Sequence, residues 1–174
     1  KFLETVKKNL VLVGMMGVGK SSIGKIVAKK QGLTFIDTDS NVEKKLSMKI
    51  SDIFKKKGEK FFRQQEEKEV LESLKKNGCL IALGGGAFME KKVRDRILKN
   101  TVSIWLDINL KTINKRIKWN KKRPLLQGED TQLVINKIYA ERKSIYIFAK
   151  YKINCNDLKK ESIVKKIISY YEKK

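Results

Sequence analysis

The chain has 174 residues, which suits one compact domain that buries roughly 70% of its unfolded surface. Its formal net charge at pH 7 is +22, yet only six of its 41 basic residues are Arg, and the others, all Lys, are spread through nearly every segment. It has no apolar run near the roughly 18 residues of a membrane span, no visible signal peptide and no basic stretch interleaved with aromatic side chains. We therefore expect a soluble domain with no membrane and no specific nucleic-acid partner.

The two cysteines, Cys79 and Cys155, lie in apolar patterns without C-x-x-C spacing, and the chain has no His to complete a metal site. Both are interpreted as structural thiols in a reducing compartment. We expect a cytoplasmic protein, with one reservation: because the sequence begins at Lys1 instead of Met, an organelle-targeting leader upstream is not ruled out.

The first predicted strand, residues 9–13, leads into a phosphate-binding pattern. Gly14-Met-Met-Gly-Val-Gly19-Lys20-Ser21 matches G-x-x-x-x-G-K-[ST], and a helix is predicted over 20–31, ending at Gly32. The glycines let backbone N–H groups point at phosphate oxygens, Lys20 reaches the β- and γ-phosphates, and the Ser21 hydroxyl ligates Mg²⁺. The alternative is a glycine-rich turn between a strand and a helix, which this context disfavours.

The second predicted strand, residues 34–37, ends at an acid pair. The strand period of two sends Asp37 and Asp39 to the same side of the carboxyl end. One acid can hold the Mg²⁺ hydration shell while the other accepts a hydrogen bond from an incoming hydroxyl. The alternative is a turn in which these acids cap a helix after Ser40.

A helix predicted over residues 59–77 ends at Gly78 and places Arg63 and Glu66 on one face. Glu66 can therefore orient the guanidinium. Arg offers a rigid planar fork for carboxylate or phosphate, so each Arg in a Lys-rich chain is informative. For Arg63, and for Arg142 further along, the alternative is a surface ion pair.

The third predicted strand, residues 79–83, runs into Gly84-Gly85-Gly86, whose backbone N–H groups are open to a ligand. The alternative is a flexible connection. Arg94 and Arg96 follow in a helical pattern that we expect to be mainly solvated.

Two more strands are predicted over residues 102–107 and 152–155. A helix begins near Asn109, a polar loop surrounds Pro124, a late helix covers 131–151, and Ser162 caps the last helix. Five strands separated by helices predict an α/β fold, with a five-stranded parallel sheet and helices on both faces. Ligands are expected beyond the carboxyl ends of the strands.

Taken together, the motifs resemble the shikimate kinase family. They occur in its order and approximate spacing over about residues 9–152: the phosphate loop, Asp37-Thr-Asp39, Gly58-Glu59-x-x-Phe62-Arg63-x-x-Glu66, Gly84-Gly-Gly86, Arg123-Pro-Leu-Leu126 and Arg142-x-x-x-Tyr146. The resemblance implies a P-loop kinase fold. It also implies transfer of the ATP γ-phosphoryl group to the 3-hydroxyl of shikimate, giving shikimate 3-phosphate and ADP in aromatic amino-acid biosynthesis.

The resemblance further implies the role of each site residue. Asp39 binds the substrate hydroxyls, Arg63 and Arg142 clamp the shikimate carboxylate, and Asp37 supports Mg²⁺ through water. The Gly-rich turn beside the substrate is Gly84, Gly85 and Gly86. The implied ATP-binding residues are Gly14, Gly17, Val18, Gly19, Lys20, Ser21, Ser22, Arg116, which packs on adenine, and Arg123. Lys20, Asp39 and Arg123 are the implied catalytic residues.

From the same resemblance we expect one domain over residues 1–174, with a mobile lid at about 119–130 that carries Arg123. We expect a monomer that uses shikimate and ATP as substrates and Mg²⁺ as cofactor. Around Asn154-Cys-Asn-Asp-Leu158, relatives often supply an Arg and a Pro against adenine, and the chain has neither. The second adenine partner is therefore left open, as is the question of whether Asp39 is a true base.

Two rival functions are kept at this point. One is another small-molecule P-loop kinase, such as a gluconate kinase, which needs no two-arginine clamp with a Gly-Gly-Gly turn. The other is a non-catalytic ATP-binding or nucleic-acid-binding module, for which the charge of +22 is the only support.

Overall fold

The computed structural model of the chain describes residues 5–118 and 130–173. Its strands are β1 (Asn9–Val13), β2 (Thr34–Asp37), β3 (Cys79–Ala82), β4 (Thr101–Asp107) and β5 (Tyr151–Asn154). Its helices are α1 (Lys20–Gln31), α2 (Thr38–Leu46), α3 (Ile50–Lys57), α4 (Glu59–Ser73), the 3₁₀ helix η1 (Ala87–Met89), α5 (Lys91–Asn100), α6 (Leu110–Lys118), α7 (Thr131–Tyr146) and α8 (Lys160–Tyr171).

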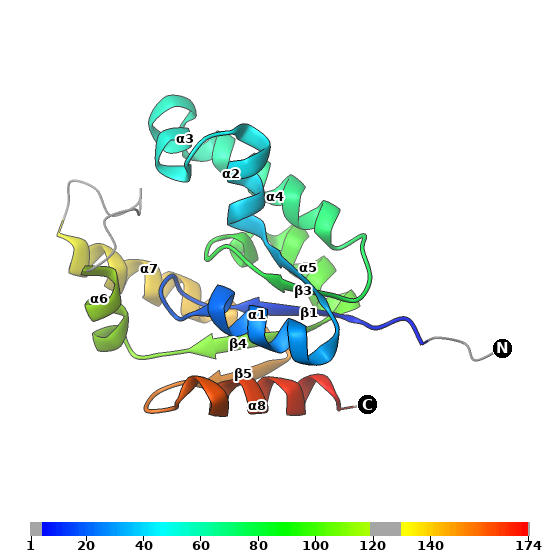
Figure 1. Ribbon diagram of the computed structural model, residues 1–174. Helices are drawn as coiled ribbons and strands as arrows, with labels where there is room; N and C mark the ends of the chain where they lie inside the picture. Colours follow the sequence, from blue (N-terminus) through cyan, green and yellow to red (C-terminus); the bar gives the residue numbers. More distant parts are fainter. Residues whose placement is uncertain (1–4, 119–129, 174) are drawn as a thin grey trace.

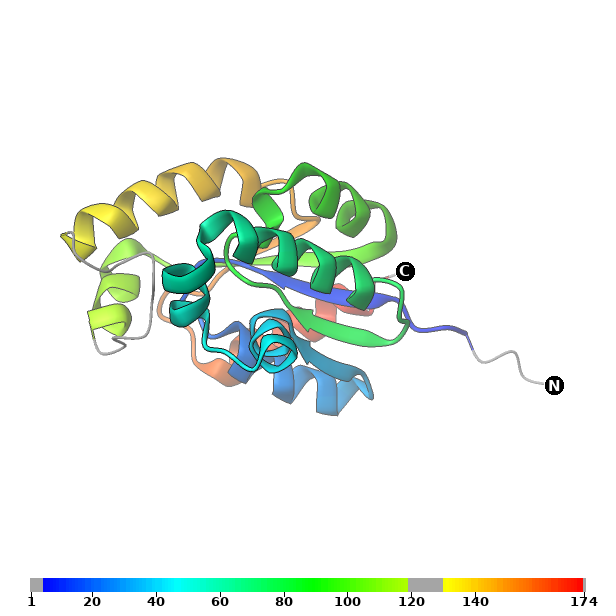
Figure 2. The same ribbon diagram turned by 90° about the horizontal axis from the view of Figure 1, so that it is seen from above.

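The strands form one parallel sheet in the order β2-β3-β1-β4-β5. Central strand β1 pairs Leu10 with Leu80 of β3 on one side and with Val102 of β4 on the other. Helices α1 and α8 cover one face of the sheet, and α4, α5 and α7 lie on the other, as the two perpendicular views show (Figure 1, Figure 2). The predicted α/β fold, with a five-stranded parallel sheet between helices, is confirmed.

Burial on both faces explains why the central strands are nearly continuous apolar runs. All of β1 and β3 is buried, and so is β4 except for its last residue. A second, smaller apolar cluster, formed by Val42, Ile53 and Phe62, joins α2, α3 and α4. These three helices thus pack as a unit at the carboxyl end of β2, next to the phosphate loop after β1 (Figure 1).

The predicted ends of several elements differ from the structure. The strands predicted over 79–83, 102–107 and 152–155 are each displaced by one residue at one or both ends. The helix predicted over 59–77 ends at Ser73, because Gly78 belongs to the sheet margin: its N–H donates to the Lys7 carbonyl (2.9 Å) and its carbonyl accepts from the Thr34 N–H (2.9 Å). The predicted end of the first helix at Gly32 is confirmed, and this residue is left-handed, with a φ of +61°.

Two expectations near the end of the chain are wrong. The helix predicted over 131–151 ends at Tyr146, where the Phe148 and Ala149 N–H groups bond to carbonyls three residues back and tighten the turn. Ser162 does not cap the last helix, because α8 begins at Lys160 and the Lys159 carbonyl accepts from the Ser162 N–H at 3.0 Å.

Arg94 is also not mainly solvated. Its Nη1 donates to the Phe88 and Met89 carbonyls, both at 3.0 Å, so it supports the end of η1. Arg96 is exposed, as expected. Within the described ranges 5–118 and 130–173, none of the helices is both long and apolar enough to cross a bilayer.

Candidate active site

The phosphate-binding pattern forms a loop between β1 and α1, as predicted. Gly17 and Gly19 have φ values of +80° and +98°, in the left-handed region that favours glycine. Lys20 is the first residue of α1, and its Nζ donates to the Gly14 and Met15 carbonyls at 2.5 and 3.0 Å. The lysine therefore lies folded over the loop, with its charge beside the N-terminus of the helix.

Ser21 and Asp37 form the next pair. The Ser21 hydroxyl donates to Asp37 Oδ2 at 2.6 Å, while Asp37 Oδ1 accepts from the Ser40 N–H at 3.0 Å and caps α2. Asp37 thus has the capping role that the sequence offered as an alternative, and its second oxygen lies beside the Ser21 hydroxyl. A hydroxyl beside a carboxylate is a suitable oxygen donor set for Mg²⁺. The described residues contain no cluster of three acidic, His or Cys side chains that could hold a metal, so the remaining ligands would be phosphate oxygens and water.

Asp39 lies in the first turn of α2, not on an extended strand, so the strand-period argument for its direction is wrong. It still faces the same cavity as Asp37, because the helix starts directly at the end of β2. Its Oδ1 is buried and has no hydrogen-bond partner. Burial, followed by the nearby charges of Glu66 and Asp37, raises the pKa of Asp39 to about 6.

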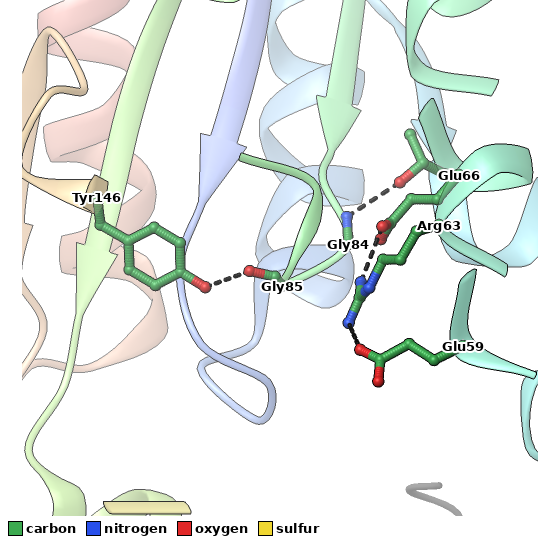
Figure 3. A network of polar contacts seen from close by, with 7 residues as sticks. Glu59, Arg63, Glu66, Gly84, Gly85 and Tyr146 are labelled. Atoms are coloured by element: carbon green, nitrogen blue, oxygen red, sulfur yellow. Dashed lines mark hydrogen bonds and ion pairs between the residues drawn. The ribbon is translucent and has the colours of Figure 1, made fainter. Parts of the chain in front are cut away.

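Arg63 and Glu66 come from α4 and form the ion pair expected from their spacing. Arg63 Nη1 donates to Glu66 Oε2 at 2.8 Å, and Arg63 Nη2 lies 3.4 Å from Glu59 Oε1 (Figure 3). Glu66 is only 2% exposed, and its Oε1 has no hydrogen-bond partner. Its burial raises the pKa of the carboxyl group above the ordinary value.

Arg142 lies on α7 and is 7% exposed, so the alternative of a surface ion pair does not hold for it. Its Nη1 is buried without a hydrogen-bond partner. An arginine nitrogen buried in this way is costly unless an anion completes its hydrogen bonds. Arg142 is therefore poised to bind a negatively charged group.

The Gly84–Gly86 turn follows β3 and lies against all of these groups. A Cβ on Gly84 would lie 2.5 Å from Asp39 Oδ1 and 2.6 Å from Glu66 Oε1, and one on Gly85 would lie 2.7 Å from Arg142 Nη1. One on Gly86 would overlap the Arg63 guanidinium. A side chain at any of these three positions would therefore displace one of the acids or arginines that converge on the turn.

A cavity of about 520 Å³ joins the phosphate loop to these side chains. The predicted site residues that line it are Gly17, Gly19, Lys20, Ser21, Ser22, Asp37, Asp39, Arg63, Gly85, Gly86 and Arg142. Gly14, Val18, Gly84 and Arg116 are not part of its lining, although Gly84 lies directly beside Asp39 and Glu66. Its remaining lining residues, absent from the predicted set, are Met16, Ser40, Glu43, Ile50, Phe54, Phe62, Glu66, Ala82 and Leu83.

Arg116 lies on the outer side of the phosphate loop. Its Nη1 donates to the Gly17 and Val18 carbonyls at 2.9 and 3.3 Å, which ties α6 to the loop. This places Arg116 beside the predicted nucleotide-binding residues. Arg123 and residues 119–129 of the predicted lid lie outside the described residues.

Comparison with known proteins relates this chain to one enzyme family. A family model described as shikimate kinase matches residues 16–172. The shikimate kinase of Sulfurihydrogenibium sp. (strain YO3AOP1) is 38% identical over 162 residues, covering 93% of this chain and 96% of the relative. The structure of shikimate kinase from Acinetobacter baumannii in complex with shikimate matches with a TM-score of 0.90 and 30% identity, covering 94% of this chain and 92% of that chain.

A gluconokinase from Sinorhizobium meliloti 1021 is a more distant structural match. Its TM-score is 0.57 at 11% identity, with 97% of this chain and 93% of that chain covered. At this identity the match shows a shared fold and nothing more specific.

Proposed function

The chain belongs to the shikimate kinase family, and on that premise we propose which of its residues bind shikimate and ATP. It is an ATP-dependent kinase that phosphorylates shikimate at the 3-hydroxyl, giving shikimate 3-phosphate and ADP. The reaction belongs to the shikimate pathway. What remains to be assigned is the part that each side chain in the cavity plays.

One observation carries the assignment of the shikimate site. Asp39 Oδ1, Glu66 Oε1 and Arg142 Nη1 are buried polar atoms without partners, and all three adjoin the Gly84–Gly86 turn. Two unpaired acceptors suit hydroxyl groups, and an unpaired guanidinium nitrogen suits a carboxylate. Shikimate carries three hydroxyls and one carboxylate on a single ring, so it satisfies all three atoms at once.

We assign Arg63 and Arg142 as the carboxylate clamp. They approach the turn from α4 and α7, so a carboxylate between them would receive donors from two directions. Glu66 accepts from Arg63 and thereby fixes the direction of its guanidinium. This orients the ring so that the 3-hydroxyl faces Asp39, which accepts its hydrogen bond.

The opposite end of the cavity is assigned to ATP. The backbone N–H groups of the phosphate loop and Lys20 bind the phosphates, with Gly14, Val18 and Ser22 completing the loop and Arg116 next to the adenine side. Ser21 and Asp37 would hold Mg²⁺, directly and through water respectively. The ion, when bound, neutralises charge on the phosphates. We further propose that Arg123 lies on a lid over residues 119–130 and stabilises charge during transfer.

Phosphoryl transfer mainly requires positioning and charge stabilisation, which these residues supply without a covalent enzyme intermediate. Asp39 holds the attacking hydroxyl, and Lys20 faces the developing charge on the phosphates. No feature of the cavity favours gluconate as the substrate, and the net charge of +22 stays the only support for a nucleic-acid partner. We also propose that the chain acts as a cytoplasmic monomer with one domain.

The clamp is tested by replacing each arginine with lysine, which keeps the charge and loses the planar fork. We expect Arg63→Lys and Arg142→Lys each to weaken shikimate binding about ten- to a hundredfold, from roughly 1.5–3 kcal/mol per charge-assisted hydrogen bond, with ATP binding unchanged. Isothermal titration calorimetry measures both ligands.

The matched control is Arg96→Lys, an exposed arginine on α5. Arg94 is unsuitable because it supports η1. A loss of shikimate affinity in Arg96→Lys as large as that at Arg63 and Arg142 would contradict the clamp. Lys20→Ala complements this test: turnover is expected to collapse while shikimate binding survives, and loss of that binding would mean that the substrate site is misplaced.

A further inference from the structure

The Gly84–Gly86 turn is held at two points by buried hydroxyl groups. The Gly84 N–H donates to Thr38 Oγ1 at 3.0 Å, and the Tyr146 hydroxyl donates to the Gly85 carbonyl. Figure 3 shows the tyrosine reaching the turn from the side opposite to Arg63 and Glu66. Three consecutive glycines have large backbone freedom, so fixed hydrogen bonds are needed to give the turn one conformation.

The surroundings of Tyr146 hold its hydroxyl in place against the Gly85 carbonyl. Tyr146 is 0% exposed, and its ring packs near those of Phe88 and Trp105, with centroid distances of 6.5 and 5.9 Å. Burial raises the pKa of Tyr146 to about 12, so the hydroxyl keeps its proton throughout the physiological range. Tyr146 follows Arg142 by one turn of α7. The Tyr146 hydroxyl bonds to the Gly85 carbonyl, and Arg142 Nη1 lies 2.7 Å from where a Cβ of Gly85 would be.

Thr38 makes the corresponding contact from the other side. It is 0% exposed and is the first residue of α2, between Asp37 and Asp39. Its bond to the Gly84 N–H holds the turn where Gly84 faces Asp39 Oδ1. Each of the two hydroxyl residues is therefore close in sequence to a proposed shikimate ligand, and it fixes the turn against that ligand.

We propose that Thr38 and Tyr146 are positioning residues that set the Gly84–Gly86 turn in register with Asp39 and Arg142. The inference rests on the proposed shikimate site. When both hydrogen bonds are formed, Asp39, which binds a hydroxyl group, and Arg142, which binds the carboxylate, are held at a fixed separation by the turn between them. Without either bond, part of the binding energy of shikimate is spent on ordering the turn.

The test removes each hydroxyl with little change in shape, by Thr38→Val and Tyr146→Phe. We expect each variant to bind shikimate about three- to tenfold more weakly, as fits the loss of one hydrogen bond, with ATP affinity unchanged. In the steady state, KM for shikimate is expected to rise while KM for ATP is constant. Thr38→Ser keeps the hydroxyl and is expected to restore shikimate affinity to within about twofold of the parent enzyme.

The chain offers two matched controls that lose the same groups elsewhere. Tyr139→Phe removes a hydroxyl that donates to Asp107 Oδ1 at 3.0 Å from the same helix, and Thr101→Val removes a buried hydroxyl that donates to the Ile97 carbonyl at 2.7 Å. Both controls are expected to lower the melting temperature about as much as the test variants. Neither is expected to change the shikimate Kd by more than about twofold.

The proposal is overturned if Thr38→Val and Tyr146→Phe lower the melting temperature as the controls do and bind shikimate normally. Arg142→Lys separates this failure from failure of the proposed site. If it weakens shikimate binding while the hydroxyl variants do not, the clamp stands and the positioning role is wrong. If all three bind shikimate normally, the site itself is misplaced. Thr38 and Tyr146 lie on separate elements, so one variant decides the matter if the other does not fold.

Discussion

Asp39 and Glu66 bring two carboxyl groups to one buried point beside Gly84. Burial is the largest cause of the raised pKa of both groups, and the charge of Glu66 raises that of Asp39 further. Arg63 offsets part of this cost by its ion pair with Glu66. A hydroxylated substrate would satisfy the acceptors that the protein leaves unpaired, so substrate binding relieves an unfavourable arrangement of the empty site.

The raised pKa of Asp39 predicts the pH dependence of the reaction. The hydroxyl-binding role requires the ionised carboxylate, so we expect kcat/KM for shikimate to fall about tenfold per pH unit below the pKa of about 6. The apparent pKa belongs to the Asp39–Glu66 pair, because the two groups interact. Initial rates between pH 5 and pH 8 measure it, and a flat profile over that range would contradict the assignment.

The same shift has a consequence for stability. Because the pKa of Asp39 is higher in the folded protein than its ordinary value of 3.8, the favourable contribution of its protonated form is present below about pH 4 and is lost as the pH rises through about 6. Asp39→Asn is therefore expected to be inactive and, at pH 8, more stable by about 1–3 kcal/mol. Denaturant unfolding at pH 8 and pH 4 measures the difference, which is expected to disappear at the lower pH.

Some residues of the site were predictable from the sequence, because short-range spacing identifies them. Examples are Lys20 in the phosphate loop and Arg63 with Glu66 on one helix face. The unpaired state of Arg142 Nη1 was not predictable, since it depends on what α7 packs against. The hydrogen bonds of Thr38 and Tyr146 to the glycine turn join distant parts of the chain. Only the RxxxY spacing pointed to the tyrosine, and it assigned no role.

At the scale of elements, the central strands β1, β3 and β4 were found from their apolar runs, which burial on both faces requires. The edge strands β2 and β5 are only partly buried and were found from shorter patterns. The bounds of the short helices α2 and α3 were not predicted, because they are stabilised by the small core of Val42, Ile53 and Phe62 and not by a long periodic pattern. The formation of α2 moves Asp39 from an expected strand end into a helix. The strand order also required the structure, since sequence patterns do not identify which strands are neighbours.

The close approach of α2 and α4 to the glycine turn predicts the effect of a single methyl group. Gly84→Ala would put a Cβ about 2.5 Å from two buried carboxylate oxygens. We expect it to weaken shikimate binding more than about tenfold and to lower stability by about 1–3 kcal/mol, as overpacking does. Calorimetry and thermal unfolding measure the two effects.

Gly24→Ala is the matched control for this substitution. Its Cβ would lie 2.9 Å from both Leu80 Cδ2 and Phe35 Cε2, between α1 and the sheet. We expect it to lower stability in the same way but to leave shikimate affinity unchanged. Equal shikimate affinity in Gly84→Ala and Gly24→Ala would show that the turn does not adjoin the substrate.

At the scale of the whole molecule, the large positive charge comes mostly from lysines, whereas several of the few arginines lie at the candidate site. Lysine is tolerated on any surface, whereas Arg63, Arg116 and Arg142 all lie at the cavity or the phosphate loop. Arg94 supports η1, which the sequence did not indicate. The single domain over residues 1–174 and the lid over 119–130 stay predictions, and so does the role of Arg123.

The sheet unites these parts, because the carboxyl ends of β1, β2 and β3 bring the phosphate loop, the acid pair and the glycine turn to one edge. Helices α4 and α7 add the two arginines from beyond that edge (Figure 1). The central claim is that this arrangement selects shikimate as the phosphoryl acceptor.

A coupled assay of ADP release tests that claim most directly. The purified chain with Mg²⁺ and ATP is measured with shikimate, with gluconate and with no acceptor. We predict that ADP release is far faster with shikimate than in either other reaction, since on the proposed assignment a hydroxylated ring carboxylate would satisfy the three unpaired polar atoms together. Equal release in all three reactions, or faster release with gluconate, would contradict the account.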